Sequence, residues 1–328
     1  MNARRCFAKL LLSGLLITTV NEAAAQMTAT LRGREGRTVE VEQYDASGVI
    51  GEFADSRVYL TWDRVQSIEG ANDEQVAAYL TAGEHLWRGL ARLDRGDPIA
   101  ALEALEVAFE TFEDEPGATA ELAADALLDA RLSISIAQRC VLPWLHVLER
   151  DATQLGRGFA RRAVIDEQWG LVPQLAPIFV PSRQSGRVAA DVAADEFGRW
   201  TIGPTRRLAE VYASALLIAA GEAPPPLDWE PSTQGVRLAR AVVEARSGDP
   251  RRRAVARDEL QEFLQSDDRP WVKAWCHAAI GLSLLEESER ERLAGVGHLL
   301  VVPSVHGETQ PYLAGLCLAS AAEALADV

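Results

Sequence analysis

The sequence predicts a mainly α-helical protein, in which a superhelix of paired helices follows a small all-β module. Aromatic residues make up only 6% of the chain, and alanine and leucine are abundant, which favours helix over sheet. From residue 72 onward, apolar residues recur at spacings of three and four. Residues 26–71 instead carry short β-rich pieces separated by turn-forming residues. We therefore expect a leader at 1–25, a β module at 26–71 and a helical domain at 72–328.

The first 25 residues have the pattern of a secretory signal peptide. Arg4, Arg5 and Lys9 supply positive charge. An apolar stretch, Leu10–Val20, follows them, and three alanines ending at Ala25 offer the small residues that a signal peptidase accepts. The apolar stretch is too short to cross about 30 Å of hydrocarbon, which argues against a membrane anchor. We expect cleavage near Ala25 and a periplasmic or secreted mature protein.

The charge of the chain excludes two classes of partner. Its 48 acidic residues outnumber 33 basic ones, giving a net charge of −15. Such a chain is repelled by nucleic-acid phosphates and by anionic lipid head groups. No later segment has the length of a membrane span. We expect no nucleic-acid partner and no membrane span in the mature protein.

The β module is expected to contain five short strands. Turn-forming stretches separate them, and this spacing predicts a small, strongly bent sheet that resembles an SH3-like half-barrel. Trp62 stands where a large side chain closes such a barrel, although a peptide-binding platform is the alternative. The five expected strands cover residues 29–31, 38–42, 48–51, 58–61 and 65–68.

The first helical pair is expected at residues 74–93 and 99–112. Both stretches carry apolar residues at helical spacing, and the Gly-Asp-Pro sequence beginning at Gly96 separates them. Proline suits the first turn of the second helix. Two helices joined by so short a turn are expected to pack antiparallel.

This hairpin resembles a tetratricopeptide (TPR) repeat. Gly89 stands where the first helix of the family has a small residue, and Gly96 follows at the turn. Ala101 and Ala108 occupy the two small positions of the second helix, with the large Leu105 between them. The match covers about 30 residues, close to one repeat. The resemblance implies a stack of hairpins with a concave face that binds proteins.

The rest of the chain repeats this pattern irregularly. A second Gly-Asp-Pro turn occurs at Gly248, and the segment around Trp275 and Gly281 again resembles the first helix of a TPR. Its partner helix is expected to end before Pro303. Residues 156–205 fit no hairpin and are expected to form an irregular insert. Helices are further expected at 121–138, 142–155, 206–220, 236–247, 251–265, 292–302 and 310–326.

Sequence motifs for catalysis or metal binding are missing. The chain has no HExxH, CxxC, GxSxG or Walker pattern, and its five histidines lie apart in the sequence. The three cysteines Cys140, Cys276 and Cys317 lie in apolar helical segments, so buried free thiols are expected, with a Cys276–Cys317 bridge as the alternative. We expect no cofactor, no metal and no enzymatic activity.

The expected function is that of an exported scaffold that binds a protein or peptide. Arg251, Arg252 and Arg253 open a helix, where positive charge is mildly unfavourable, so they are candidate contacts for an anion or carboxylate. Trp169 and Trp200 lie in the irregular insert and are candidate binding residues. Around them, binding of a small molecule or glycan is the alternative function, and an enzyme assembled in three dimensions is the third.

Overall fold

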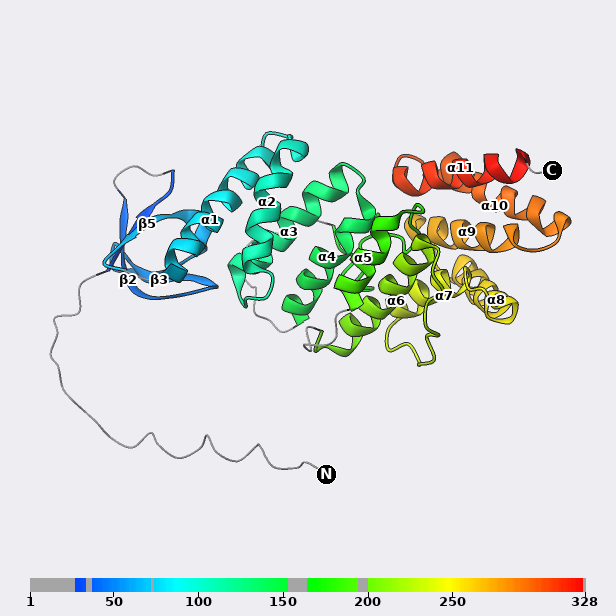
Figure 1. Cartoon of the computed structure of the whole chain (residues 1–328), viewed down its shortest axis with the longest axis horizontal. Helices are drawn as coiled ribbons and strands as arrows, with labels where there is room; N and C mark the ends of the chain where they lie inside the picture. Colours follow the sequence, from blue (N-terminus) through cyan, green and yellow to red (C-terminus); the bar gives the residue numbers. More distant parts are fainter. Residues whose placement is uncertain (1–26, 34–36, 72–73, 153–163, 194–199, 327–328) are drawn as a thin grey trace, which may run out of the picture.

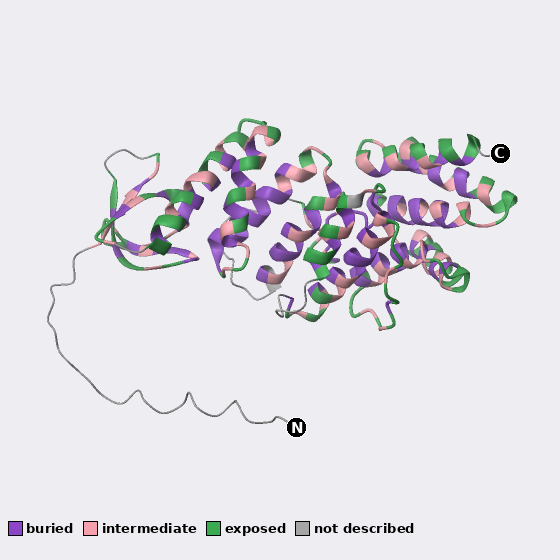
Figure 2. Cartoon of the chain, viewed as in Figure 1, coloured by how far each residue is buried: buried purple, intermediate pink, exposed green. Residues whose placement is uncertain are grey.

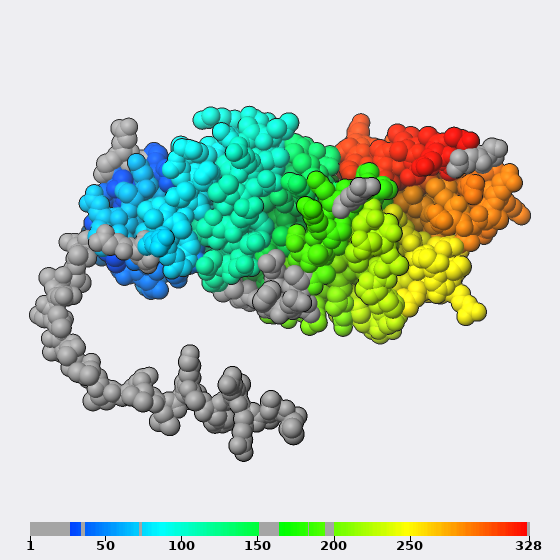
Figure 3. Space-filling model, viewed as in Figure 1, coloured from blue at the N-terminus to red at the C-terminus, as the bar shows by residue number. Residues whose placement is uncertain are grey.

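The computed structural model describes residues 27–33, 37–71, 74–152, 164–193 and 200–326. The expected signal peptide lies outside these residues. The described part is mainly helical, with a small antiparallel sheet at the N-terminal end (Figure 1). The helices follow one another in chain order from the sheet to α11 at the opposite end, and together they form one elongated body (Figure 3).

The sheet confirms the five expected strands. Its order is β4-β3-β2-β1-β5, and neighbouring strands run antiparallel. Register shifts interrupt the β1–β5 and β2–β3 ladders, which is how a short sheet bends strongly. The strands are β1 (Thr28–Leu31), β2 (Thr38–Asp45), β3 (Gly48–Phe53), β4 (Ser56–Leu60) and β5 (Val65–Glu69).

Trp62 belongs to the core beneath the sheet. It lies in a short 3-10 helix, Trp62–Arg64, and its side chain is fully buried. The indole Nε1 donates a hydrogen bond to the carbonyl oxygen of Asp45 at 2.9 Å, and the ring lies 5.3 Å from that of Tyr79 in the first helix. A tryptophan with a satisfied N–H and no exposed face is a core residue, so Trp62 offers no platform for a peptide.

Successive helices of the described chain pack against one another, with several contacts that reach one helix further. A mainly α fold of consecutively packed helices preceded by a β module is therefore confirmed. The helices are α1 (Glu74–Leu93), α2 (Pro98–Phe112), α3 (Ala118–Ser133), α4 (Ala137–Ala152), α5 (Arg183–Ala193), α6 (Gly203–Ala220), α7 (Gln234–Glu244), α8 (Pro250–Ser266), α9 (Pro270–Leu285), α10 (Glu289–His306) and α11 (Pro311–Ala326). Within the described residues, none of them combines the length and the apolarity needed to span a membrane.

The turn between α1 and α2 forms as its residues predict. Gly96 adopts a φ of +75°, a conformation that glycine tolerates best. Asp97 caps α2, because its carboxylate accepts a hydrogen bond from the N–H of Ala100 at 3.1 Å. Pro98 then occupies the first turn, where no helical N–H is needed.

Two expectations about the helices were wrong. The insert is not wholly irregular, because α5 forms within it and packs against α6 and α4. Helix α10 does not end before Pro303 but continues through it to His306. The proline removes one backbone hydrogen bond, yet Val302 and His306 are buried, and their packing holds the last turn in place.

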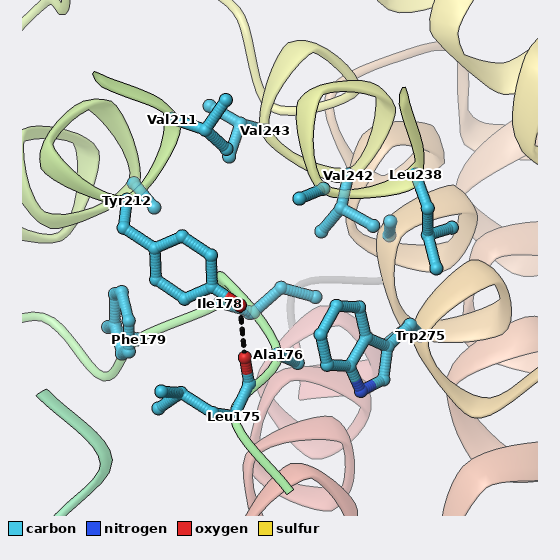
Figure 4. Close-up of a cluster of buried hydrophobic side chains, with 14 of the residues drawn as sticks. Leu175, Ala176, Ile178, Phe179, Val211, Tyr212, Leu238, Val242, Val243 and Trp275 are labelled. Carbon is cyan, nitrogen blue, oxygen red and sulfur yellow. Dashed lines mark hydrogen bonds between the residues drawn. The ribbon is translucent and has the colours of Figure 1, made fainter. Parts of the chain in front are cut away.

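The buried hydrophobic residues form three clusters along the stack. Figure 2 shows the buried positions on the sides of the helices that face one another. The first joins the sheet to α1, α2 and α3, the second joins α1 to α4, and the third runs from the end of α3 to α11. Figure 4 shows part of the third cluster, where the hydroxyl of Tyr212 donates to the carbonyl oxygen of Leu175 at 2.6 Å. This bond fixes the 172–182 segment against α6.

Candidate binding groove

A groove of about 550 Å³ crosses four consecutive helices, α2 to α5. Its walls carry exposed charged residues and its floor is apolar, and a groove of this volume is large enough for a short peptide segment or a small molecule. The lining residues are Glu106, Phe109, Glu110, Glu113, Arg131, Arg139, Leu142, Gln184, Arg187, Val188 and Asp191.

One carboxylate organises the end of the groove formed by α2, α3 and α4. Oε1 of Glu106 lies 2.8 Å from Nη2 of Arg131 and 3.5 Å from Nη1 of Arg139. Arg131 also donates to the carbonyl oxygen of Arg139 at 2.5 Å. The two guanidinium groups share one carboxylate, so these three residues together carry a net positive charge.

Three further charged groups on the walls form no ion pair with another described residue. Glu110 on α2 and both Arg187 and Asp191 on α5 are exposed, and they make no ion pair within the described residues. Both signs of charge are thus offered to a ligand from opposite walls. Because these groups are solvated in the free protein, pairing them with a partner sets orientation and specificity more than affinity.

The floor of the groove lies where two hydrophobic cores meet. Phe109 is 5% exposed, and Leu142 and Val188 are partly buried. Leu142 packs against both the α1–α4 cluster and the large C-terminal cluster. An apolar side chain of a ligand therefore finds a continuous apolar surface between the charged walls.

Trp200 lies behind this floor and holds α5 in position. Its side chain is 3% exposed, and its Nε1 donates to the carbonyl oxygen of Val192 at 3.0 Å. Its ring lies 5.1 Å from that of His146, which lies 5.3 Å from the ring of Phe109. Trp200 was a candidate binding residue. It is buried, and it supports the wall and floor of the groove from within.

Trp169 is likewise a core residue. It is 6% exposed, and its ring contacts those of Phe263 and Trp271 at centroid distances of 5.7 Å and 5.5 Å. The guanidinium of Arg269 lies 5.1 Å from the same ring. These partners occupy the surface of Trp169 that a ligand would need, and the residue lies outside the groove lining.

The three consecutive arginines of α8 do not form a common anion site. Arg251 is exposed, whereas Arg252 pairs with Asp228 at 2.7 Å. Arg253 is buried and pairs with Glu287 at 3.1 Å. Two of the three candidate binding arginines are therefore already paired with carboxylates of the chain, Arg252 at the surface and Arg253 in a buried position.

The residues expected to pack one helix on another lie at close approaches between helices. A Cβ atom on Gly89 would lie 2.4 Å from Cδ2 of Leu105, and one on Gly281 would lie 2.7 Å from Cγ of Leu299. Neither helix pair leaves room for a larger residue. Ala101, Leu105, Ala108 and Trp275 are fully buried, while Gly96 lies in the turn with open space around it.

Two histidines meet although they are 21 positions apart. Nδ1 of His277 on α9 lies 3.0 Å from Nδ1 of His298 on α10. Burial, together with the positive charge that His298, His306 and Lys273 carry when protonated, lowers the pKa of His277 to about 4. His298 therefore faces a residue of the preceding helix, a contact that the separation of the two histidines in the sequence does not indicate.

Among the described residues, the cysteines form no disulfide, and the side chains that can bind a metal form no metal site. Cys140, Cys276 and Cys317 are free and buried, and burial raises the pKa of the Cys140 and Cys317 thiols to about 12. Across the described ranges, no three His, Cys, Asp or Glu side chains come together to hold a metal ion.

Reasoning from the sequence missed the residues of the groove. Glu106, Glu110 and Arg187 look like ordinary charged surface positions, and α5 itself was not expected. The one available signal was a run of carboxylates at spacings of three and four on α2, from Glu103 to Glu113. Neither the protein-family models, nor the curated proteins, nor the solved structures contain a match to this chain.

Proposed function

We propose that this protein is an exported, non-enzymatic scaffold that binds a segment of another protein in the groove across α2 to α5. The observation that carries the proposal is the groove itself, with its apolar floor at Phe109 and Leu142 and, on its walls, the charges of Glu110, Arg187 and Asp191, which pair with no other described residue. A partner segment with both signs of charge and an apolar residue between them fits these walls.

The helical stack supports the resemblance to TPR repeats. The contact of Gly89 with Leu105 places a small residue of one helix against a large residue of the next, as the family pattern implies. The pair Gly281 and Leu299 repeats this arrangement near the other end of the chain. The bent five-stranded sheet around Trp62 supports, in the same way, the SH3-like assignment of the β module.

Site-specific photo-crosslinking tests the scaffold proposal. A photoreactive phenylalanine analogue replaces Glu110 in the groove or, as the matched control, Glu103 on the same helix outside the groove lining. After irradiation of intact cells, we expect one defined protein adduct from position 110 and none from position 103. Charge reversal on the opposite wall, Arg187→Glu, should then reduce the yield of that adduct.

The test separates binding in the groove from non-specific contact. Equal adducts from both positions, or a yield that Arg187→Glu leaves unchanged, would contradict binding in the groove. Export is tested separately, because cleavage near Ala25 gives a periplasmic or secreted protein that begins at Gln26. Mass spectrometry of the N-terminal peptide from each cell fraction reads this out, and an uncleaved Met1 terminus would contradict it.

A further inference from the structure

A second hollow, of about 460 Å³, lies beside the ends of α6 and α7. The loop between these two helices forms one of its walls, including Pro224, Pro225 and Pro226. Three successive prolines restrict that loop, so the hollow has a stiff side that is largely formed before any ligand arrives. It shares no lining residue with the groove across α2 to α5.

Arg246 lines this hollow just beyond the end of α7. Its Nη1 atom is buried and has no hydrogen-bond partner. No carboxylate forms an ion pair with it within the described residues, and burial lowers the pKa of its guanidinium, with only the phenol of Tyr312 opposing that shift. The residue as a whole is partly exposed, and a guanidinium that is partly removed from water without a counter-ion is destabilising.

Other arginines of this region form ion pairs with carboxylates of the chain. Arg237 lies 2.5 Å from Glu259, Arg252 lies 2.7 Å from Asp228, and Arg253 lies 3.1 Å from Glu287. Each of them meets a carboxylate supplied by the chain itself. Arg246 lines the same hollow as Arg252 and has a buried Nη1 atom, yet it forms no ion pair with any described carboxylate. Its missing counter-ion is consistent with one supplied by a ligand.

The remaining lining restricts the kind of anion. Glu222, Glu244 and Asp249 also line the hollow, and their charges disfavour a dianion such as phosphate. Ile218 and Leu227 offer apolar surface beside them. Arg252, the other guanidinium of the lining, is already paired with Asp228 and Glu244. One guanidinium without an ion pair, a surrounding negative field and an apolar wall together match a monoanion that has an apolar body.

We propose that this hollow binds the carboxylate of an apolar ligand, with the guanidinium of Arg246 as its counter-ion and Ile218 and Leu227 against its apolar part. The ligand is a free carboxylic acid or the C-terminal carboxylate of a peptide that ends in an apolar residue. The chemistry of recognition is the same for both. This site does not depend on the groove across α2 to α5.

The test is calorimetric titration of the full chain with four probes. Hexanoate and N-acetyl-leucyl-leucine carry the carboxylate, and hexanamide and the C-terminal amide of the same dipeptide are their neutral counterparts. We expect at least one acid to bind and its amide to bind about tenfold more weakly or not at all, because a charge-assisted hydrogen bond is lost. Which of the two acids binds identifies the source of the carboxylate.

Arg246→Met is the decisive variant, because methionine keeps a long, unbranched, apolar side chain. It should weaken binding of the acid about tenfold or more. Its unliganded melting temperature should equal or exceed that of the wild type, since an unpaired, partly buried cation has been removed. Arg251→Met, on an exposed arginine outside the lining, is the matched control and should change neither quantity.

Four outcomes would overturn the proposal. They are undiminished binding of the acid by Arg246→Met, equal binding of acid and amide, tighter binding of inorganic phosphate than of either acid, and no binding of either acid. Glu110→Lys, in the groove across α2 to α5, should leave carboxylate binding unchanged. Failure here is thereby distinguished from failure of the proposed scaffold function.

Discussion

Adding one methyl group to Gly89 tests the close approach of α1 and α2. In an open helix, Gly→Ala stabilises by about 0.5–1 kcal/mol, because alanine has the higher helix propensity. At Gly89 the new Cβ would lie 2.4 Å from Cδ2 and 2.5 Å from Cγ of Leu105, well inside contact distance. Overpacking of this kind costs about 1–3 kcal/mol. The cost of the steric overlap exceeds the gain in helix propensity, so we expect Gly89→Ala to lower the free energy of unfolding by about 1–2 kcal/mol.

Urea unfolding followed by circular dichroism measures this change, and Gly297→Ala provides the control. Gly297 also lies inside a helix, but nothing lies within 4 Å of its added Cβ. We therefore expect Gly297→Ala to stabilise by about 0.5–1 kcal/mol. The two identical substitutions should change the free energy of unfolding in opposite directions.

A double-mutant cycle with Leu105→Ala completes the test. Alone, Leu105→Ala leaves a cavity and should cost about 2–5 kcal/mol. In its presence, Gly89→Ala should no longer destabilise, because the atoms it overlaps have been removed. Stabilisation by Gly89→Ala alone, or strictly additive effects in the cycle, would refute the argument that α1 and α2 are in steric contact at this position.

Three further predictions follow from buried contacts. Trp200→Phe removes the donor to the carbonyl oxygen of Val192 and should cost about 1–2 kcal/mol, with faster amide hydrogen exchange in α5; unchanged exchange there would contradict a positioning role. Gly117→Ala should destabilise by about 2–3 kcal/mol, because its Cβ would lie 2.0 Å from that of Ser47 in the β2–β3 turn; a thermal melt compares it with Gly96→Ala, which keeps the positive φ but has open space. The pKa of His277 is depressed to about 4 in the folded protein, so between pH 6.5 and 4 the unfolded chain binds a proton at His277 and the folded protein does not. The free energy of unfolding therefore decreases as the pH falls through this range. Urea unfolding measures the decrease in the free energy of unfolding between pH 7.5 and pH 5.0. This decrease should be about 1 kcal/mol smaller in His277→Gln than in the wild type, after allowance for solvent screening. Equal decreases in the two proteins would contradict the depressed pKa.

Local patterns predicted the first hairpin and the sheet well. The amphipathic stretch from Glu74 to Leu93 matches α1 at both ends, because a long apolar periodicity and a Gly-Asp-Pro break leave little choice. The start of α10 was placed too late, although its signal was present. Ser288 and Glu291 form a capping box, the Ser-x-x-Glu pattern that marks a helix start.

The groove could not be predicted because its parts are joined only by tertiary packing. Helix α5 has only 11 residues and is polar overall, so the few apolar positions on its face, Val188, Ala189 and Val192, are too short a run to indicate a helix from the sequence. Trp200 was assigned to binding because exposure is not visible in a sequence. Its burial depends on His146, 54 positions earlier, which no local pattern relates to it.

The consecutive packing of the helices has a consequence for how the chain acquires its structure. Strand β1 pairs with β5, so the sheet can close once Glu69 is available, without any later residue. Most contacts after that join neighbouring helices, which keeps the sequence separation of contacts short. A chain released from its N-terminus onward can therefore assemble progressively, each new helix docking on the one before it, and only a short length of apolar surface is unprotected at any time.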